Sequence, residues 1–503
     1  MRFLFYKTRD LNLGVLSGLL VGVSYHAPYL GIIAYFGFIP LFHSWINNNP
    51  KKNLITGYIF GVTYNLISNY WIATNSGAPF YVVLFSLLAA VAYLSIFWGI
   101  AGVVVGFYNK TKLIYYMLPF LIVSLEWIRS FGPLGFSWGN LALTQINILP
   151  LLQHIDYAGT YIITSWIIII NLILYYQFFV NKIERKRLFY IIFVLILFFC
   201  SGWLKMKFYE LEDYSDSVNI AIIQPNIDPN EKWNKNDRIE LYNFMDSLYT
   251  EAIKLNPDLI LFPETALPTY IRINNAVKKQ LQSRVDSSMI PILIGTVDRR
   301  FDSNKNKKFY NSTIYFQPKK DFEIYDKIHL VPFAEYDLVP SFLHPLVNLN
   351  INIDRGVFKA GEDYKIFKFK DLSFSGLICY ESSLPRYARR FTKKGANLLM
   401  IQANDGWLGN SQGPYQHFNN AILRAIENRV PIARSGNTGI SGVILPSGRV
   451  VRKIVLDQKT VFSHQIPYNK SSSFYSHFGD LFAVCSFIIF LFIGPVITCI
   501  KKY

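Results

Sequence analysis

Eight mostly apolar stretches of transmembrane type constrain this 503-residue chain more than any other feature. A helix needs about 20 such residues to cross roughly 30 Å of hydrocarbon. The stretches lie near Leu11–Tyr25, Leu30–Trp45, Leu54–Ile72, Tyr81–Phe107, Leu113–Ile128, Gly159–Val180, Leu188–Leu204 and Gly479–Ile500. The sequence therefore predicts a multi-helix transmembrane bundle of about seven helices in residues 1–205 and a C-terminal transmembrane helix at residues 479–500.

The basic residues that flank these stretches predict the topology, because positively charged loops tend to stay in the cytoplasm. They lie in the N-terminus (Arg2, Lys7, Arg9), the Lys51-Lys52 loop, the Lys110/Lys112 loop, the Lys182–Arg187 loop and the Lys501-Lys502 tail. These are the two ends of the chain and every second loop, so we expect the segment between the seventh and eighth stretches to be non-cytoplasmic. A cleavable signal peptide is the competing interpretation of the N-terminus, but no convincing small-residue cleavage site follows the first apolar run.

The formal net charge of +17 raises the question of nucleic-acid binding. No Gly/Arg tract, zinc spacing or ribonucleoprotein motif accompanies that charge, and much of the Lys and Arg flanks apolar runs. We therefore attribute the basic excess to membrane topology and to attraction toward anionic lipid, and we expect no nucleic-acid partner.

Residues 217–468 show a different pattern, in which short apolar runs alternate with amphipathic, charged segments. The runs that indicate buried strands are Val218–Ile223, Leu259–Phe262, Ile292–Ile294, Leu377–Ile378 and Leu398–Ile401. Segments with helical spacing lie between them, including Asp237–Leu255 and Gln416–Asn428. This alternation predicts a layered α/β domain with its chemistry at strand ends.

Three strand ends carry side chains suited to catalysis. Glu264, directly after a buried run, is placed to act as a general base, with a helix-capping or solvated glutamate as the open alternative. Lys327 offers an ammonium to a developing oxyanion, although a surface lysine is the commoner role. Cys379 is suited to nucleophilic attack where a neighbouring base or cation favours the thiolate, and a structural cysteine is the alternative.

The cysteine count excludes a disulfide within the polar segment. Cys200, Cys485 and Cys499 all lie in apolar runs, where cysteine usually acts as a small packing residue. Cys379 is thus the single cysteine of residues 217–468, and its thiol is left free.

In their order along the chain and in their local sequence, these three segments resemble the nitrilase superfamily, and the whole chain resembles the apolipoprotein N-acyltransferase family. The motifs that carry the closer resemblance are Gln224-Pro225-Asn226, Lys232-Trp233, the Lys327 stretch ending at Glu335, Asn404-Asp405-Gly406-Trp407, Gln416-His417-Phe418, Arg434–Gly439 and, in the apolar part, Glu126–Arg129 with Gly135–Trp138. Family members commonly have other residues at Ala334, Gly406 and Leu408. These departures remove no reacting group, but they leave the shape of two loops open.

The resemblance implies a four-layer αββα sandwich for residues 217–468, with Glu264, Lys327 and Cys379 as the catalytic set. It also implies that the backbone N–H of Tyr380 helps Lys327 to stabilise the oxyanion. We place Glu335 and Glu381 in support of Lys327 and Cys379, as residues that orient them electrostatically. Trp233 and Trp407 are candidates to line an acyl path, although Trp233 is equally well explained as an aromatic residue packing on its own loop.

The activity implied is acyl transfer from a phospholipid, through a thioester on Cys379, to the N-terminal α-amine of a diacylglyceryl-modified apolipoprotein. The resemblance places such an enzyme in the bacterial inner membrane as a multi-pass protein with its catalytic domain on the periplasmic side. A membrane-tethered nitrilase-like amidase is the nearest alternative, and a transporter or lipid-binding protein with an inactive polar domain is the alternative from another class.

No cofactor is expected, because the chain has no Gly-rich phosphate loop. Nor do we expect a metal, since the histidines of the polar segment show no zinc-type spacing. They are His329, His344, His417 and His464.

Overall fold

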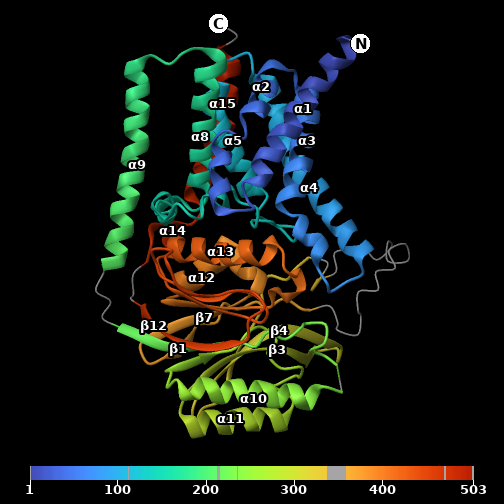
Figure 1. Ribbon diagram of the computed structural model, residues 1–503, viewed down its shortest axis with the longest axis vertical. Coiled ribbons are helices and arrows are strands. Elements are labelled where there is room, and N and C mark those ends of the chain that lie inside the picture. The colour runs from blue at the N-terminus through green and yellow to red at the C-terminus, as the bar shows by residue number, and fades with distance from the viewer. Residues whose placement is uncertain are drawn as a thin grey trace. The chain divides into compact units, whose positions relative to one another are not determined.

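The computed structural model describes residues 2–111, 113–211, 216–234, 236–332, 334–336, 358–468 and 472–500 (Figure 1). Lys112, His344 and the Lys501-Lys502 tail lie outside these residues. The chain forms two compact units. Unit 1 comprises Met1–Ala73, Val83–Leu211 and Phe478–Tyr503, and unit 2 comprises Thr74–Val82 and Glu212–His477.

Unit 1 is helical. Its α-helices are α1 (Arg2–Val23), α2 (Ile39–Asn47), α3 (Pro50–Ser68), α4 (Phe80–Tyr108, whose first residues belong to unit 2), α5 (Ile114–Ile128), α6 (Leu149–Leu152), α7 (Ile155–Ala158), α8 (Tyr161–Tyr175), α9 (Arg185–Leu211) and α15 (Leu481–Ile500). The stretch predicted at Leu30–Trp45 is divided between a 3-10 helix, η1 (Pro28–Tyr35), and α2.

Four helical stretches among the described residues are long and apolar enough to cross a membrane. They are Pro28–Asn47, Phe80–Tyr108, Tyr161–Val180 and Arg185–Glu210. Shorter apolar helices cover Ile114–Ile128 and Leu481–Phe492. The apolar helices agree with the predicted bundle, whereas the number of about seven crossings stays a prediction.

Small residues explain how α1 and α3 pack so closely. Gly14, Gly18 and Gly22 recur every fourth residue of α1 and therefore lie on one helix face. A β-carbon at Gly14 would lie 2.9 Å from the backbone oxygen of Thr56, and one at Gly18 would lie 2.7 Å from Cβ of Thr63. Larger side chains on this face would force the two helices apart, as in other membrane helix pairs.

Unit 2 contains two six-stranded sheets. The first has the order β12-β1-β2-β3-β4-β5 and the second has the order β11-β10-β9-β8-β7-β6. The strands of the first are β1 (Asp216–Gln224), β2 (Leu259–Leu261), β3 (Ile292–Phe301), β4 (Lys307–Phe316), β5 (Glu323–Asp326) and β12 (Thr460–Tyr468); those of the second are β6 (Phe367–Phe369), β7 (Leu372–Ile378), β8 (Leu398–Ala403), β9 (Ile432–Gly436), β10 (Ser441–Ile444) and β11 (Val450–Ile454). Strands β1, β2 and β3 are parallel, as are β7, β8 and β9, and the remaining pairs are antiparallel.

Helices cover the outer faces of both sheets, so that unit 2 has four layers (Figure 1). Helices α10 (Arg238–Lys254) and α11 (Asn275–Ser288) lie on the first sheet, and α12 (Pro385–Lys393) and α13 (Gln412–Asn428) lie on the second. The predicted αββα sandwich is thus confirmed. All five predicted strand runs are strands, and both predicted helical segments are helices.

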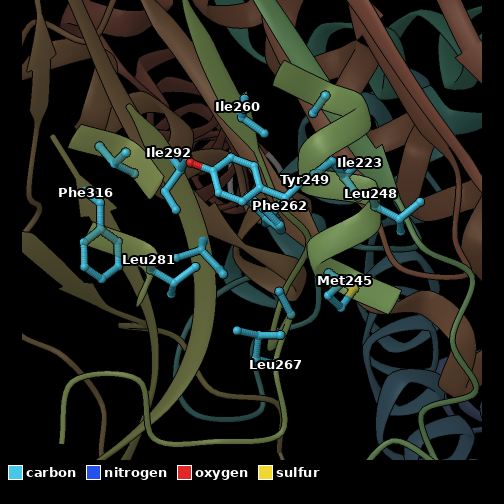
Figure 2. Close-up of a cluster of buried hydrophobic side chains, with 14 of the residues drawn as sticks. Ile223, Met245, Leu248, Tyr249, Ile260, Phe262, Leu267, Leu281, Ile292 and Phe316 are labelled. Atoms are coloured by element: carbon cyan, nitrogen blue, oxygen red, sulfur yellow. The ribbon is translucent and has the colours of Figure 1, made fainter. Parts of the chain in front are cut away.

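The apolar core under α10 and α11 is built from the alternating side chains of the first sheet (Figure 2). Ile260 and Phe262, at β2 and just after it, pack with Tyr249 of α10 and Phe316 of β4. Between the two sheets the approach is close, since a β-carbon at Gly376 would lie 2.7 Å from Cγ2 of Thr313. This packing fixes where the strands end, and the strand ends carry the site.

The core predicts how the fold responds to truncation. Ile260 is completely buried, so Ile260→Ala removes apolar contacts and leaves a cavity. We expect it to lower the free energy of unfolding of unit 2 by about 2–5 kcal/mol. Ile239→Ala is the matched control, because Ile239 is 75% exposed and its truncation should change stability by less than about 0.5 kcal/mol. Thermal unfolding of the full chain in detergent compares the two, and equal midpoints would contradict this core.

Candidate active site

Glu264, Lys327 and Cys379 each follow a strand of unit 2, namely β2, β5 and β7. The first two side chains are buried, with 6% of Glu264 and 1% of Lys327 exposed. The backbone around Glu264 is crowded: Thr265 has φ 45°, and a β-carbon at Gly295 would lie 2.7 Å from Cα of Glu264. Glycine at position 295 therefore allows the Glu264 loop to lie directly against β3.

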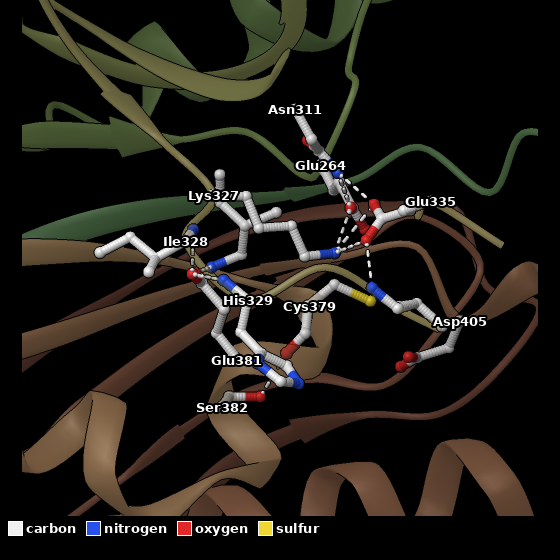
Figure 3. Close-up of polar contacts among 12 residues, drawn as sticks. Glu264, Asn311, Lys327, Ile328, His329, Glu335, Cys379, Glu381, Ser382 and Asp405 are labelled. Carbon is white, nitrogen blue, oxygen red and sulfur yellow. Dashed lines mark hydrogen bonds and ion pairs between the residues drawn. The ribbon is translucent and has the colours of Figure 1, made fainter. Parts of the chain in front are cut away.

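A buried network joins the carboxylate of Glu264 to the ammonium of Lys327 (Figure 3). The Nζ of Lys327 lies 3.8 Å from Oε1 of Glu264 and donates to Oε1 of Glu335 over 2.9 Å. Asn311, on β4, donates from its amide to Oε1 of Glu264 over 2.7 Å and to Oε1 of Glu335 over 2.9 Å. Although burial lowers the pKa of Lys327, Glu335 and Glu264 outweigh it and raise that pKa, so the lysine is a permanent cation.

Cys379 is held in an unusual backbone conformation at the first position of a 3-10 helix, η7 (Cys379–Ser383). Its φ of 49° is a left-handed value that non-glycine residues rarely adopt, and such strain clusters at functional positions. Its thiol hydrogen-bonds to Glu264. Burial, together with the charge of Glu264, raises the pKa of the thiol well above its usual range, so Cys379 needs a base before it can attack.

Glu264 is suited to be that base. Burial raises the pKa of its carboxyl, while Lys327 opposes the shift. A carboxylate with a raised pKa is a stronger proton acceptor than an ordinary surface glutamate. The geometry therefore brings a thiol, a carboxylate with a raised pKa and a fixed cation together at one site.

Glu381 acts through specific hydrogen bonds, whereas the sequence suggested only an electrostatic role. Its carboxylate accepts hydrogen bonds from the hydroxyl of Tyr325 and from the backbone N–H groups of Ile328, His329 and Ile378, at distances of 2.7–3.1 Å. It thereby ties the loop that carries Lys327 to the turn that carries Cys379. Burial raises the pKa of Glu381 to about 7.

A second buried cluster supports Cys379 at the same edge of the second sheet, because Asp405 follows β8 and Cys379 follows β7, its parallel neighbour. His417, on α13, lies 2.6 Å from Oδ1 of Asp405 through Nδ1 and 3.0 Å from the carbonyl oxygen of Cys379 through Nε2. Arg434 donates to Oδ2 of Asp405 over 2.7 Å. These contacts hold the Cys379 turn in its strained conformation.

Cys379, Asp405 and His417 also offer three ligand atoms within 4.8 Å of one another, which invites a comparison with a metal site. The ring nitrogens of His417 and both oxygens of Asp405 already have protein partners. The guanidinium of Arg434 against Asp405 supplies the positive charge that a cation would otherwise bring. This donor set is therefore organised as a hydrogen-bonded support and does not fit a metal ion.

The remaining candidates lie around this centre. The ring of Tyr380 is buried and stacks on His329, with 5.6 Å between ring centroids. Trp233 is half-buried in the turn after β1. Trp407 is half-buried, and its carbonyl oxygen accepts from the backbone N–H of Ser76, in the short segment of unit 2 that precedes α4. The roles that we assigned to these residues, and to the catalytic set, stay predictions.

Several contributors were not among the predicted site residues. Asp405, His417 and Arg434 were noted within motifs but given no role. Asn311 lies inside a strand whose sequence shows only ordinary alternation, and its importance comes from its two carboxylate partners. Lys232 was noted within a motif but given no role, yet it is 2% exposed and its pKa responds to Glu264. The one feature of the sequence that could have identified Lys232 as a site residue is its position beside Trp233 in that motif.

Comparison with known families identifies the family of this chain. Residues 219–474 match the carbon-nitrogen hydrolase family, about half of the chain, and the chain belongs to that family. Residues 17–173 match the N-terminal domain of apolipoprotein N-acyltransferases. The resemblance stated from the sequence is thereby confirmed.

Among curated relatives, the apolipoprotein N-acyltransferase of Geobacter metallireducens is 29% identical over 486 residues, covering 94% of this chain and 92% of that one. The apolipoprotein N-acyltransferase of Rickettsia typhi is 28% identical over 507 residues, covering 98% and 99% of the two chains. Among solved structures, Nit3 of Saccharomyces cerevisiae, a nitrilase-superfamily member, aligns with 50% of this chain and 91% of its own at 17% identity and a TM-score of 0.39.

Asn311 gives a direct test of the buried network. Asn311→Leu keeps the approximate volume but leaves Glu264 and Glu335 without a shared donor, so the base loses its orientation. We expect the rate at which Cys379 reacts with an acyl donor to fall about 10- to 100-fold, the effect of losing a hydrogen bond to a charged group. Asn304→Leu, in an exposed turn, is the control and should leave the rate unchanged. An unchanged rate in Asn311→Leu would show that the network does not position the base.

Proposed function

We propose that this protein is a membrane N-acyltransferase that moves an acyl chain from a phospholipid to the α-amine of a diacylglyceryl-modified cysteine at the N-terminus of apolipoproteins. The observation that carries the proposal is the convergence of Glu264, Lys327 and Cys379 in one buried network, in a chain that also has membrane-length apolar helices. The near-full-length relatives named apolipoprotein N-acyltransferase support the same substrate pair.

In the first half of the reaction, Glu264 takes the proton of the Cys379 thiol and the sulfur attacks an ester carbonyl carbon of the phospholipid. Lys327 and the backbone N–H of Tyr380 stabilise the negative charge that forms on the carbonyl oxygen. When the tetrahedral intermediate collapses, the C–O bond breaks and Glu264 returns the proton to the departing alkoxide. A lysophospholipid leaves, and the acyl group stays on Cys379 as a thioester.

In the second half, the apolipoprotein amine attacks the thioester carbon. Glu264 takes a proton from the attacking nitrogen and passes it to the sulfur as the C–S bond breaks. The products are the amide and the regenerated thiol, so one site serves both substrates in turn. The second attack needs no new group, because the same base and the same cation act on the same carbonyl.

The apolar helices are explained by the substrates. Each buried methylene of an acyl chain holds a lipid in the bilayer by about 0.8 kcal/mol, so extracting a whole phospholipid is costly. An enzyme embedded in the bilayer avoids that step. We place the protein in the bacterial inner membrane with unit 2 on the periplasmic side, as the basic loops indicate.

An amidase that acts on small soluble amides would use the same three groups. The match of residues 17–173 to the acyltransferase N-terminal domain favours acyl transfer instead. Trp233 and Trp407 are proposed to line the path of the acyl chain, and Glu335 and Glu381 to hold Lys327 and the Cys379 turn in place.

Labelling of the thiol tests the proposal. Purified protein incubated with a phospholipid that carries a radiolabelled acyl chain should acquire a hydroxylamine-sensitive label, which Cys379→Ala abolishes. Cys200→Ala and Cys485→Ala are matched controls, since both thiols lie in apolar helices, and they should label like the wild type. A label that survives Cys379→Ala would refute the thioester. An unlabelled wild type that releases ammonia from simple amides would favour the amidase.

The pH dependence of thioester formation tests the role of Glu264. Burial raises the pKa of Glu264 above the ordinary carboxyl value of 4.5, and the protonated acid cannot accept the thiol proton. The rate should therefore fall as the pH drops through a midpoint above 4.5, while Lys327 stays charged throughout. Initial rates between about pH 4 and 9 give the profile. A midpoint at or below pH 4.5, or the same fall in rate at low pH in Glu264→Gln, would show that another group is the base.

A further inference from the structure

Lys232 is a buried cation that the mechanism above does not use. It lies in the turn after β1, with 2% of the residue exposed. Among the described residues no hydrogen-bond acceptor reaches its Nζ. A buried ammonium without an acceptor costs several kcal/mol, so a residue of this kind needs an explanation.

Lys232 and Glu264 lie beyond the same edge of the first sheet, because they follow β1 and β2, which are parallel neighbours. Burial lowers the pKa of Lys232 to about 8, and the charge of Glu264 opposes that shift. At neutral pH the ammonium is therefore still the main form. Glu264 nevertheless does not accept a hydrogen bond from the lysine, since the Nζ of Lys232 has no hydrogen-bond partner among the described residues.

The turn that carries Lys232 is held rigidly. The backbone N–H of Lys232 donates to the carbonyl oxygen of Asp228 over 3.1 Å, and the N–H of Asn230 donates to Oδ1 of Asp228 over 2.8 Å. The backbone N–H of Ile227 donates to Oδ1 of Asn437, and the side-chain amide of Asn437 donates to the carbonyl oxygen of Ile227. Asn437 directly follows β9 of the second sheet. The backbone that carries the ammonium is thus held in place by hydrogen bonds, as expected for a preorganised binding group.

Among the residues that the structure describes, Lys232 is a buried cation whose ammonium has no hydrogen-bond acceptor. Lys327 is engaged by Glu335 at 2.8 Å, so its charge is already balanced. A glycerophospholipid brings to the site both the ester carbonyl that reacts and, across the glycerol unit, a phosphodiester anion. A phosphate oxygen is a strong acceptor for a lysine ammonium.

We propose that the Nζ of Lys232 binds the phosphodiester group of the donor lipid, so that the site selects a glycerophospholipid over an uncharged ester. The inference rests on the function proposed above and deepens it by assigning the part of the donor that is recognised. Binding of the anion supplies the acceptor that Lys232 lacks, and it places the ester carbonyl beside Cys379. Release of the lysophospholipid removes that anion and clears the site for the amine.

The test compares two donors on the full-length protein in detergent: phosphatidylglycerol and the uncharged ester p-nitrophenyl palmitate. Thioester formation on Cys379 is measured for the wild type, Lys232→Met and Lys232→Arg. We expect Lys232→Met to lower kcat/KM for phosphatidylglycerol about 10- to 100-fold more than for the uncharged ester, and Lys232→Arg to restore most of the difference. Lys254→Met, at an exposed position of α10, is the matched control and should alter neither rate.

The outcomes separate the alternatives. If Lys232→Met lowers kcat/KM equally for both donors and shifts the pH at which the rate falls, Lys232 acts as a counter-ion of Glu264. That result would overturn the proposal. Unchanged rates with both donors would also overturn it. Thioester formation from neither donor in the wild type would instead refute the proposed function itself, which makes that failure distinguishable.

Discussion

The buried contact of Lys327 with Glu335, shared through Asn311 with Glu264, is the interaction on which the rest of the site depends. Burying charges is unfavourable unless each finds a partner, and here the partners come from two strand ends, the loop that follows β5 and the interior of β4. The network can form only when β2, β4 and β5 lie in register in one sheet. The fold of unit 2 is therefore a condition for the charge state of the site.

Cys379 belongs to the other sheet, and its placement needs a second set of constraints. Glu381 binds the backbone of both sheets, at Ile328 and at Ile378, while His417, held by Asp405, contacts the carbonyl oxygen of Cys379. The left-handed backbone at Cys379 is maintained by these bonds and not by the residue itself. Strain in one residue is thus supported by several ordinary hydrogen bonds around it.

Much of this arrangement follows from the sequence, for reasons that differ between elements. The strands at Val218–Ile223 and Leu398–Ile401 were predictable because short apolar runs end sharply at polar residues. The placement of Glu264, Lys327 and Cys379 at strand ends followed from the same pattern, and their convergence followed from the resemblance.

Asn311 was not predictable, because the role of an asparagine in a strand depends on its neighbours on the adjacent strands. Glu381 was expected to act through its charge, but its contacts are with backbone N–H groups that local sequence does not reveal. In unit 1, the division of Leu30–Trp45 into two helical pieces was also beyond a hydropathy pattern, which measures apolar length and not helix geometry.

The central claim is that the acyl group is carried on Cys379 with its carbonyl oxygen held by Lys327. An experimental structure of the protein trapped after reaction with a phospholipid, in the absence of an amine acceptor, tests it most directly. The account predicts density for an acyl chain joined to Sγ of Cys379, with the thioester oxygen within hydrogen-bonding distance of Nζ of Lys327 and of the backbone nitrogen of Tyr380. An acyl group on any other side chain, or a thioester oxygen directed away from Lys327, would contradict it.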